Sequence, residues 1–549
     1  MALPPSRTTA RRACPSFPRP ATKSSPSALP LTPCSQLVVR PPAHHRPTPH
    51  ASGFLDAGSG TKLHYWFATA QGSAADKAPV VLWLNGGPGS SSILGMLEEH
   101  GPLIMGGEGK LIDNPYAWNR VANLVVLESP AGVGYSYCAD HAKGCKNTDN
   151  STAADARRAM QDFFKTKFPE LAKNPFTITG ESYAGVYVPT LSREILDNAP
   201  EINLVSIAVG DPCTDNDAQT QSMDMLWYSH KHGFVPDADY ELLSKKCGAK
   251  YPSPLARGHH DAASMSAAGF RGYTMEKQSP ECIAANRKFQ ASTSKGISQG
   301  WPLAWLNDLS LYGPAAVVDS GQKGSLNFLV ALYMMRADVK KAMHTEVSPN
   351  PAWPGPGDNW GYTSNWGACS GMPAGTPSMV DFYRYIAPKL KRTVVFNGDT
   401  DPCVSYEGTR TALESITSAT AHRGLGNADF SELPGGAYRP WFYNTTVASK
   451  TFMHNKPLLF GPALSFAKAG VLFGGHVVDY SHNLSFITVH GSGHMVPQFR
   501  PQAALHMLTT VLAEGGFAPP LVPDAQLAAM ADDAFDTYLD KWTTSAFAV

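Results

Sequence analysis

Phe176-Thr-Ile-Thr-Gly-Glu-Ser-Tyr-Ala-Gly185 is an apolar, β-branched run that stops abruptly at a serine between small residues. A serine on a sharp strand-to-helix turn has a strained backbone and an exposed hydroxyl, and small neighbours prevent clashes there. Gly180 stands two residues before Ser182, as the G-x-S-x-G pattern requires, whereas Ala184 replaces the second glycine. The stretch predicts a nucleophile elbow with Ser182 as the nucleophile, and an ordinary turn is the alternative.

Residues 393–401 and 486–494 are two further β-rich runs, and they end in an acid and a histidine. The first ends in Gly-Asp-Thr-Asp401 and the second in His-Gly-Ser-Gly-His494. The chain order Ser, Asp, His is that of α/β-hydrolases and differs from the orders in the chymotrypsin and subtilisin folds. Because the functional crevice of an open α/β sheet lies beyond the carboxyl ends of its strands, residues this far apart in sequence can converge there.

The composition is that of an ordinary globular protein with a large core: 549 residues, 43% hydrophobic and 16% charged. Its 45 basic and 45 acidic residues balance, which gives no support for nucleic-acid binding. No apolar run is long enough to predict a membrane span. Neither a CxxC pair nor an HExxH helix occurs, so we predict no metal and no cofactor.

Strand-like and helix-like patterns alternate along most of the chain. The runs at residues 80–85, 124–127, 176–179 and 204–209 are dense in aliphatic and β-branched residues, as strands buried on both faces should be. A helical stripe of apolar residues at 156–168 lies between two of them. The alternation predicts an α/β fold, with a central, mostly parallel sheet flanked by helices.

We expect five segments from these patterns. Residues 1–50 are rich in Arg, Ser and Pro and lack acidic residues, which predicts a processed or disordered leader and resembles an organelle transit peptide. The others are a hydrolase core in two parts, 51–213 and 391–515, an inserted and mainly helical cap at 214–390, and a C-terminal extension at 516–549. The inserted region includes a helical piece at 331–344, and the second core part includes a helix at 501–513.

Cysteines and glycosylation motifs bear on the compartment. Three sequons, at Asn150, Asn444 and Asn483, favour the secretory route, with a vacuolar, lysosomal or extracellular destination. An odd number of cysteines follows the leader. Cys138 and Cys145 bracket a short polar loop and could close a local disulfide, whereas spacing does not give the connectivity of the others, Cys213, Cys247, Cys282, Cys369 and Cys403.

Five blocks in this order resemble those of the serine carboxypeptidase family. They are residues 83–90 (Trp-Leu-Asn-Gly-Gly-Pro-Gly-Ser), 128–136 (Glu-Ser-Pro-Ala-Gly-Val-Gly-Tyr-Ser), 180–185, 398–401 and 490–497. The resemblance spans residues 52–513 and implies an α/β-hydrolase fold. It also implies a serine-type peptidase that removes C-terminal residues from peptides and proteins through an acyl-enzyme intermediate. Because acidic groups at a terminal carboxylate must keep a proton while the catalytic histidine must be neutral, we expect a mildly acidic pH optimum.

The family usually has a cysteine where Ser90 stands, bridged to a partner that Cys369 resembles. The resemblance therefore implies that Cys369 lacks its usual mate. We expect it to pair elsewhere or to stay free.

The resemblance also assigns roles in the reaction. Ser182 attacks the acyl carbon, His494 transfers the proton, and Asp401 orients the imidazole. Asp399 is the competing acid, which we interpret as a loop-capping residue, and we interpret His490 as structural. The backbone N–H groups of Gly87 and Tyr183 match the family's oxyanion hole, whereas a plain tight turn is the alternative for Gly86 and Gly87.

Recognition of a free C-terminal carboxylate falls, by the same resemblance, to Asn85, the Gly86 N–H, Glu99 and Glu181, with Trp83 in support. A solvated helix face is the alternative for Glu99. If both glutamates converge on a substrate carboxylate, like charges should raise the pKa of at least one of them.

Two other functions remain open. An acyltransferase of the same family would use the same triad with sugar-ester donors, but that branch tends to replace the asparagine that this chain has at Asn85. A non-catalytic binding protein on the same fold would be expected to have lost a member of the triad, and none is lost. We therefore expect the C-termini of peptides to be the substrates, and no oligomeric state is predicted.

Overall fold

The computed structural model describes residues 48–72, 75–106, 109–222, 225–250, 275–293, 326–357, 359–373, 375–402, 404–417, 428–444 and 470–548. The predicted leader at 1–50 lies outside the described residues except for its last three, and so does Cys403. No helix in the described ranges combines the length and apolar character that crossing a membrane requires.

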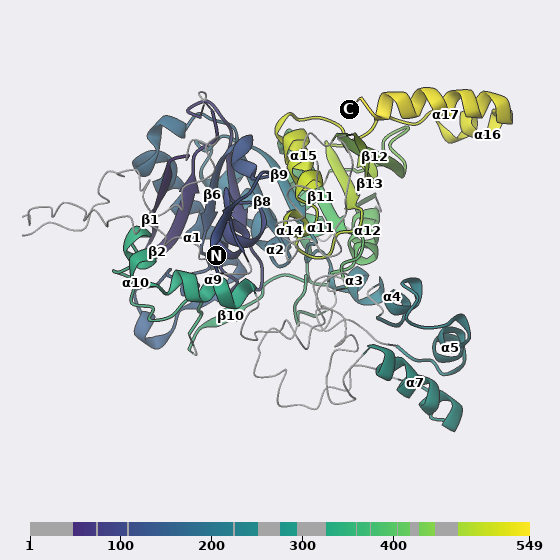
Figure 1. Cartoon of the computed structure of the whole chain (residues 1–549), viewed down its shortest axis with the longest axis horizontal. Helices are drawn as coiled ribbons and strands as arrows, with labels where there is room; N and C mark the ends of the chain where they lie inside the picture. Colours follow the sequence, from purple (N-terminus) through teal and green to yellow (C-terminus); the bar gives the residue numbers. More distant parts are fainter. Residues whose placement is uncertain are drawn as a thin grey trace, which may run out of the picture. The chain divides into compact units, whose positions relative to one another are not determined.

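A sheet of ten strands forms the centre of the fold (Figure 1). Its inner strands pair parallel, and two antiparallel pairings extend it at each side. This arrangement confirms the predicted α/β class and its parallel centre. In spatial order the strands are β1 (His50–Gly58), β2 (Thr61–Ala68), β6 (Asn123–Leu127), β3 (Val80–Leu84), β8 (Phe176–Glu181), β9 (Leu204–Gly210), β11 (Arg392–Gly398), β14 (Leu484–Val489), β13 (Val471–Tyr480) and β12 (Arg439–Asn444).

The inner strands are buried on both faces, as their apolar runs predict. In β3, Val80, Leu82 and Leu84 belong to one core cluster, and the alternate residues Val81 and Trp83 belong to a second. The first cluster includes side chains of α1 (Asp149–Asp162), α2 (Ala184–Asn198), α11 (Met379–Ile386) and α12 (Tyr406–Glu414), and the second includes those of α15 (Pro501–Leu512). Helices therefore cover both faces of the sheet.

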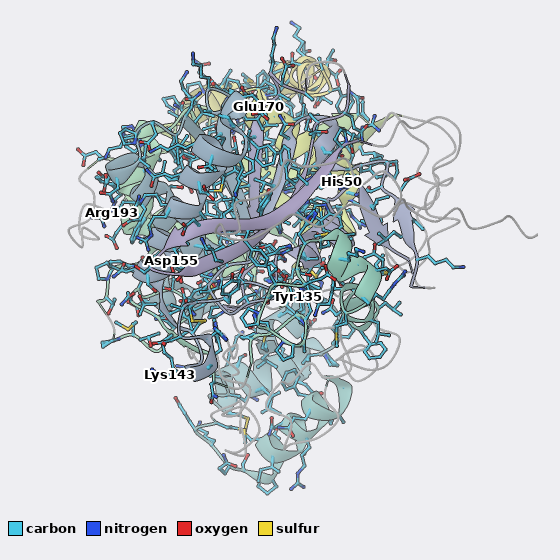
Figure 2. The ribbon with its side chains drawn as sticks, turned by 90° about the vertical axis from the view of Figure 1, so that its left-hand side faces the viewer. His50, Tyr135, Lys143, Asp155, Glu170 and Arg193 are labelled. Carbon is cyan, nitrogen blue, oxygen red and sulfur yellow. A yellow bond between two sulfur atoms is a disulfide. The ribbon has the colours of Figure 1, made fainter. Side chains whose placement is uncertain are left out.

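The predicted apolar stripe at 156–168 belongs to the first of these layers. Its first part, up to residue 162, lies in α1, and the phenylalanines that follow lie in and just after the π-helical turn η4 (Phe163–Lys167). The side chain of Thr148 caps α1 by accepting a hydrogen bond from the Ser151 N–H at 3.1 Å. Figure 2 labels Asp155 on α1 and Arg193 on α2, and these two helices contact each other.

In its described residues, the region predicted as an insertion is mainly helical. Part of it has a small core of its own, formed by Met225, Leu226, Tyr228, Leu243 and Phe289. The helical piece expected at 331–344 consists of two helices. The elements are α3 (Asn216–Ser222), α4 (Met225–Lys231), α5 (Asp237–Glu241), η6 (Leu242–Lys246), α7 (Pro280–Thr293), α9 (Leu326–Met334), α10 (Ala337–Ala342) and β10 (Gly361–Thr363).

The far end of this region, however, includes α11, which packs against α2 in the core layer. The domain boundaries remain predictions.

The helix expected at 501–513 is α15. The remaining elements are η1 (Gly95–Glu99), β4 (Leu103–Met105), β5 (Leu111–Asp113), η2 (Trp118–Arg120), η3 (His141–Lys143), β7 (Lys146–Thr148), η5 (Pro169–Leu171), η8 (Ala387–Lys389), η9 (Ser415–Thr417), α14 (Val496–Phe499), α16 (Asp524–Ala529) and α17 (Asp532–Ala546).

Three disulfides connect described residues. Cys138–Cys145 is the predicted local bridge. Cys369 pairs with Cys213, so the expectation that it either pairs elsewhere or stays free is resolved in favour of pairing. The third bridge, Cys247–Cys282, lies beside the small core of the inserted region.

The two bridges of the core should differ in their effect on stability. They join residues 156 and 7 positions apart, and a longer loop loses more entropy in the unfolded chain when it is closed. We expect Cys213→Ser/Cys369→Ser to lower the free energy of unfolding by about 5 kcal/mol and Cys138→Ser/Cys145→Ser by about 2 kcal/mol. Denaturant unfolding of both double variants measures this. A larger loss from the short loop would contradict the loop argument.

Candidate active site

Ser182 stands on a strained turn between β8 and α2. Its φ is +62°, in the left-handed region that residues with a side chain rarely adopt. Its N–H donates to the Gly210 carbonyl at 2.9 Å, and its carbonyl accepts from the N–H groups of Gly185 at 2.8 Å and Cys213 at 3.0 Å. Its side chain is partly exposed although both neighbours in sequence are buried. This is the geometry predicted for an elbow that presents a hydroxyl.

The small residues around Ser182 are required by close packing. A Cβ on Gly180 would collide with the Leu84 carbonyl and would approach the Ala184 Cβ to 2.7 Å. A Cβ on Gly185 would collide with the Cys213 carbonyl. Ala184 is fully buried, so the departure from G-x-S-x-G is accommodated in the packing.

Asp401 and His494 meet beyond the ends of β11 and β14. The His494 Nδ1 lies 2.7 Å from the Asp401 Oδ2, and both side chains are buried. The same Asp401 oxygen accepts a hydrogen bond from the Val404 N–H at 3.1 Å. The structure therefore brings together the acid and the histidine that the sequence predicts as partners.

The competing acid is engaged elsewhere. Asp399 Oδ2 lies 2.8 Å from the Nδ1 of His490, and its Oδ1 accepts from the Gly491 N–H at 2.6 Å. The His490 side chain is more than half exposed. These contacts agree with a loop-capping Asp399 and a structural His490.

The elbow adjoins this pair through the end of β9. Gly210, which accepts the Ser182 N–H, directly precedes Asp211. One carboxyl oxygen of Asp211, one of Asp401 and one ring nitrogen of His494 all lie within 4.8 Å of one another. Ser182, Asp401 and His494 therefore share the same edge of the parallel sheet, as the strand-end argument predicts.

The first glycine after β3 lies against the elbow, and the second adopts a backbone conformation that favours glycine. A Cβ on Gly86 would collide with the Tyr183 backbone nitrogen and would lie 2.8 Å from the Ser182 Cβ. Gly87 has a φ of +109°, and a Cβ there would lie 2.6 Å from the Gly89 nitrogen. Gly86 thus passes directly beside the Tyr183 backbone nitrogen, at the start of α2 where the helix dipole favours negative charge. The oxyanion-hole role of the Gly87 and Tyr183 N–H groups stays a prediction.

Asn85 joins two buried glutamates. Its Nδ2 donates to the Oε1 of Glu181 at 2.7 Å and to the Oε1 of Glu99 at 3.2 Å. Its Oδ1 accepts from the Trp83 Nε1 at 2.8 Å and from the Gly95 N–H at 3.1 Å. Because these two donors hold the amide oxygen, the amide nitrogen must face the carboxyl groups.

Glu99 lies in η1 and is only 2% exposed. This burial excludes the alternative that Glu99 lies on a solvent-exposed helix face. Burial raises the pKa of Glu99 to about 7, against weaker lowering by its hydrogen bonds with Asn85 and Glu181. Burial also raises the pKa of Glu181 well above its ordinary value, and the charge of Glu99 adds to this. The direction expected from sequence is confirmed, although burial contributes more than like charge.

Sequence reasoning missed three buried acids around the site. Glu128 accepts from the Tyr135 N–H at 2.9 Å and the Trp353 Nε1 at 2.7 Å, which orders the 128–136 block. Asp149 accepts from the Tyr183 hydroxyl at 2.9 Å. Asp211 follows β9 directly, so the strand-end rule that found Asp401 and His494 could also have found it.

Comparisons with known proteins match most of the chain to one family. The family model described as serine carboxypeptidase matches residues 41–514. Serine carboxypeptidase-like 34 of Arabidopsis thaliana is 31% identical, with 86% of this chain and 87% of the relative covered. The lysosomal protective protein of Mus musculus is 27% identical, with 84% and 90% covered.

A solved structure has the same fold. The prohormone-processing carboxypeptidase Kex1(delta)p of Saccharomyces cerevisiae superposes with a TM-score of 0.57 at 18% identity, over 85% of this chain and 91% of that chain. The family match over residues 41–514 covers most of the chain. The chain belongs to the serine carboxypeptidase family and is a hydrolase with the α/β-hydrolase fold.

Proposed function

We propose that the protein removes C-terminal residues from peptides with Ser182 as nucleophile, His494 as general base and acid, and Asp401 as the group that orients the imidazole. The observation that carries the proposal is the Asn85–Glu181 hydrogen bond next to the elbow. Glu181 immediately precedes Ser182, so a carboxylate bound at Glu181 places the last peptide bond of a substrate close to the nucleophile.

The chemistry proceeds in two halves. Neutral His494 takes the Ser182 proton while the Oγ attacks the carbonyl carbon, and the resulting oxyanion accepts hydrogen bonds from the Gly87 and Tyr183 N–H groups. His494 returns the proton to the amine of the departing residue. Water, deprotonated by His494, then attacks the acyl-enzyme, and His494 returns this proton to the Ser182 oxygen as the peptide acid leaves.

The terminal carboxylate is bound in this proposal by hydrogen bonds from Asn85, the Gly86 N–H and a protonated glutamate. An ionised Glu99 or Glu181 would repel it, whereas a protonated one donates. Because burial raises the pKa of Glu99 to about 7 and the pKa of Glu181 well above its ordinary value, mildly acidic conditions favour the protonated forms and hence peptide binding.

We also propose a secretory destination of the lysosomal or vacuolar kind. The mouse relative carries a lysosomal name. Three disulfides in the described ranges fit an oxidising compartment. A mildly acidic lumen would also keep the glutamate pair protonated.

Replacing the nucleophile tests the triad. We expect Ser182→Ala to abolish release of C-terminal residues and covalent labelling by an organofluorophosphate, because the attacking oxygen is gone, with little change in Tm. Ser545→Ala, an exposed serine of α17, is the matched control and should label fully. Assaying sugar esters with the same wild-type preparation tests acyl transfer. Full labelling of Ser182→Ala would place the nucleophile elsewhere.

The pH dependence of KM tests Glu99. In the wild type, KM for free-acid peptides should rise as pH passes about 7, because the raised pKa of Glu99 means that its proton, and hence the donor, is lost there. Glu99→Gln donates through its amide at every pH, so its profile should be flatter. Glu170→Gln, an exposed glutamate of η5 labelled in Figure 2, serves as the control. Identical profiles for all three proteins would remove Glu99 from carboxylate recognition.

A further inference from the structure

Asp211 lies next to Asp401 and His494 at the edge of the sheet, but it takes no part in the proposed acyl-transfer steps. It follows the last residue of β9 and is fully buried. Its φ of +42° is in the left-handed region, which is costly for a residue with a Cβ. Its N–H donates to the Phe396 carbonyl at 2.7 Å. A strained backbone and a buried carboxyl in one residue indicate that the surrounding structure holds it in place.

The two carboxyl oxygens of Asp211 have different environments. Oδ1 accepts from the Gly398 N–H at 2.9 Å and from the Asn397 Nδ2 at 3.3 Å. Oδ2 is buried and has no N–H or hydroxyl donor among the described residues. Since one carboxyl oxygen of Asp211 lies within 4.8 Å of a carboxyl oxygen of Asp401, the carboxyl group of Asp211 is next to the acid of the proposed triad.

We infer that Asp211 is a positioning residue, a neutral carboxylic acid whose Oδ2–H donates a hydrogen bond to the Asp401 carboxylate and holds it toward His494. The inference rests on the proposed triad. Two ionised carboxylates cannot hydrogen-bond to each other, but a single proton between them turns a repulsive contact into a strong one.

The placement of the proton follows from the charges around it. The titratable groups that face Asp211 are Asp401, His494 and, farther away, Glu181. Burial raises the pKa of Asp211 well above its ordinary value, and the charges of Asp401 and Glu181 raise it further, against a smaller lowering by the Gly398 N–H. Asp401 contacts the imidazole that becomes positive during the reaction, so negative charge is best stabilised there.

Labelling of Ser182 by an organofluorophosphate tests this inference without a peptide substrate. We expect Asp211→Ala to label about 10- to 100-fold more slowly, the factor associated with losing a hydrogen bond to a charged group. Asp211→Asn keeps a donor toward Asp401 through its amide and should recover most of the rate. The wild-type rate should fall at alkaline pH as Asp211 loses its proton, and the Asn variant should lack this fall. Thermal unfolding of each variant controls for folding.

The outcomes are distinct. Wild-type protein that fails to label at Ser182 would overturn the proposed triad itself. Labelling of wild type with equal rates for Asp211→Ala would overturn only the role of Asp211. Equal slowing in the Ala and Asn variants, with the same pH profile as wild type, would also overturn it, because a structural role does not depend on a donor.

Discussion

The backbone hydrogen bonds of Ser182 to the end of β9 are the constraint on which the active site depends. The Ser182 N–H donates to the Gly210 carbonyl, and the Ser182 carbonyl accepts from the Cys213 N–H. These bonds stabilise the unfavourable positive φ of Ser182. The segment that accepts and donates these bonds is anchored by the Cys213–Cys369 bridge. Strain at the elbow is therefore opposed by hydrogen bonds, a disulfide and close packing of small residues.

Several buried carboxyl groups share the edge of the sheet beside this elbow. Glu99, Glu181, Asp211 and Asp401 are each nearly or fully buried. Burying charge in a low-dielectric interior is costly, and burial accordingly raises the pKa of the first three, which favours their neutral forms.

The same protons link stability to pH. The pKa of Glu99 is raised from 4.5 to about 7, so the folded state holds this proton more tightly than the unfolded chain does. Its contribution to stability is fully present below pH 4.5 and is lost as pH rises through 7. Folding and proposed peptide recognition therefore favour the same mildly acidic range.

Much of this arrangement could be predicted from the sequence, because strand ends carry a strong local signal. The runs ending at Ser182, Asp401 and His494 predict both the parallel sheet and the meeting of three distant residues at one edge. The strand-end rule could also have found Asp211, which directly follows β9, but its role depends on its distance to Asp401, which no local pattern encodes. The partner of Cys369 was left open for the same reason. Burial of Glu99 likewise depends on the packing of η1 and is absent from the residue pattern around it.

Discrimination between free-acid and amidated peptides tests the central claim most directly, namely that Asn85 and its glutamates bind a terminal carboxylate. In the wild type, amidation should lower kcat/KM by a factor that corresponds to about 1–3 kcal/mol of transition-state binding, because a buried polar group loses its partner. Asn85→Ala should reduce this difference strongly, whereas Asn150→Ala, an exposed asparagine of α1, should leave it unchanged. Equal kcat/KM for the two peptides in the wild type would contradict the account.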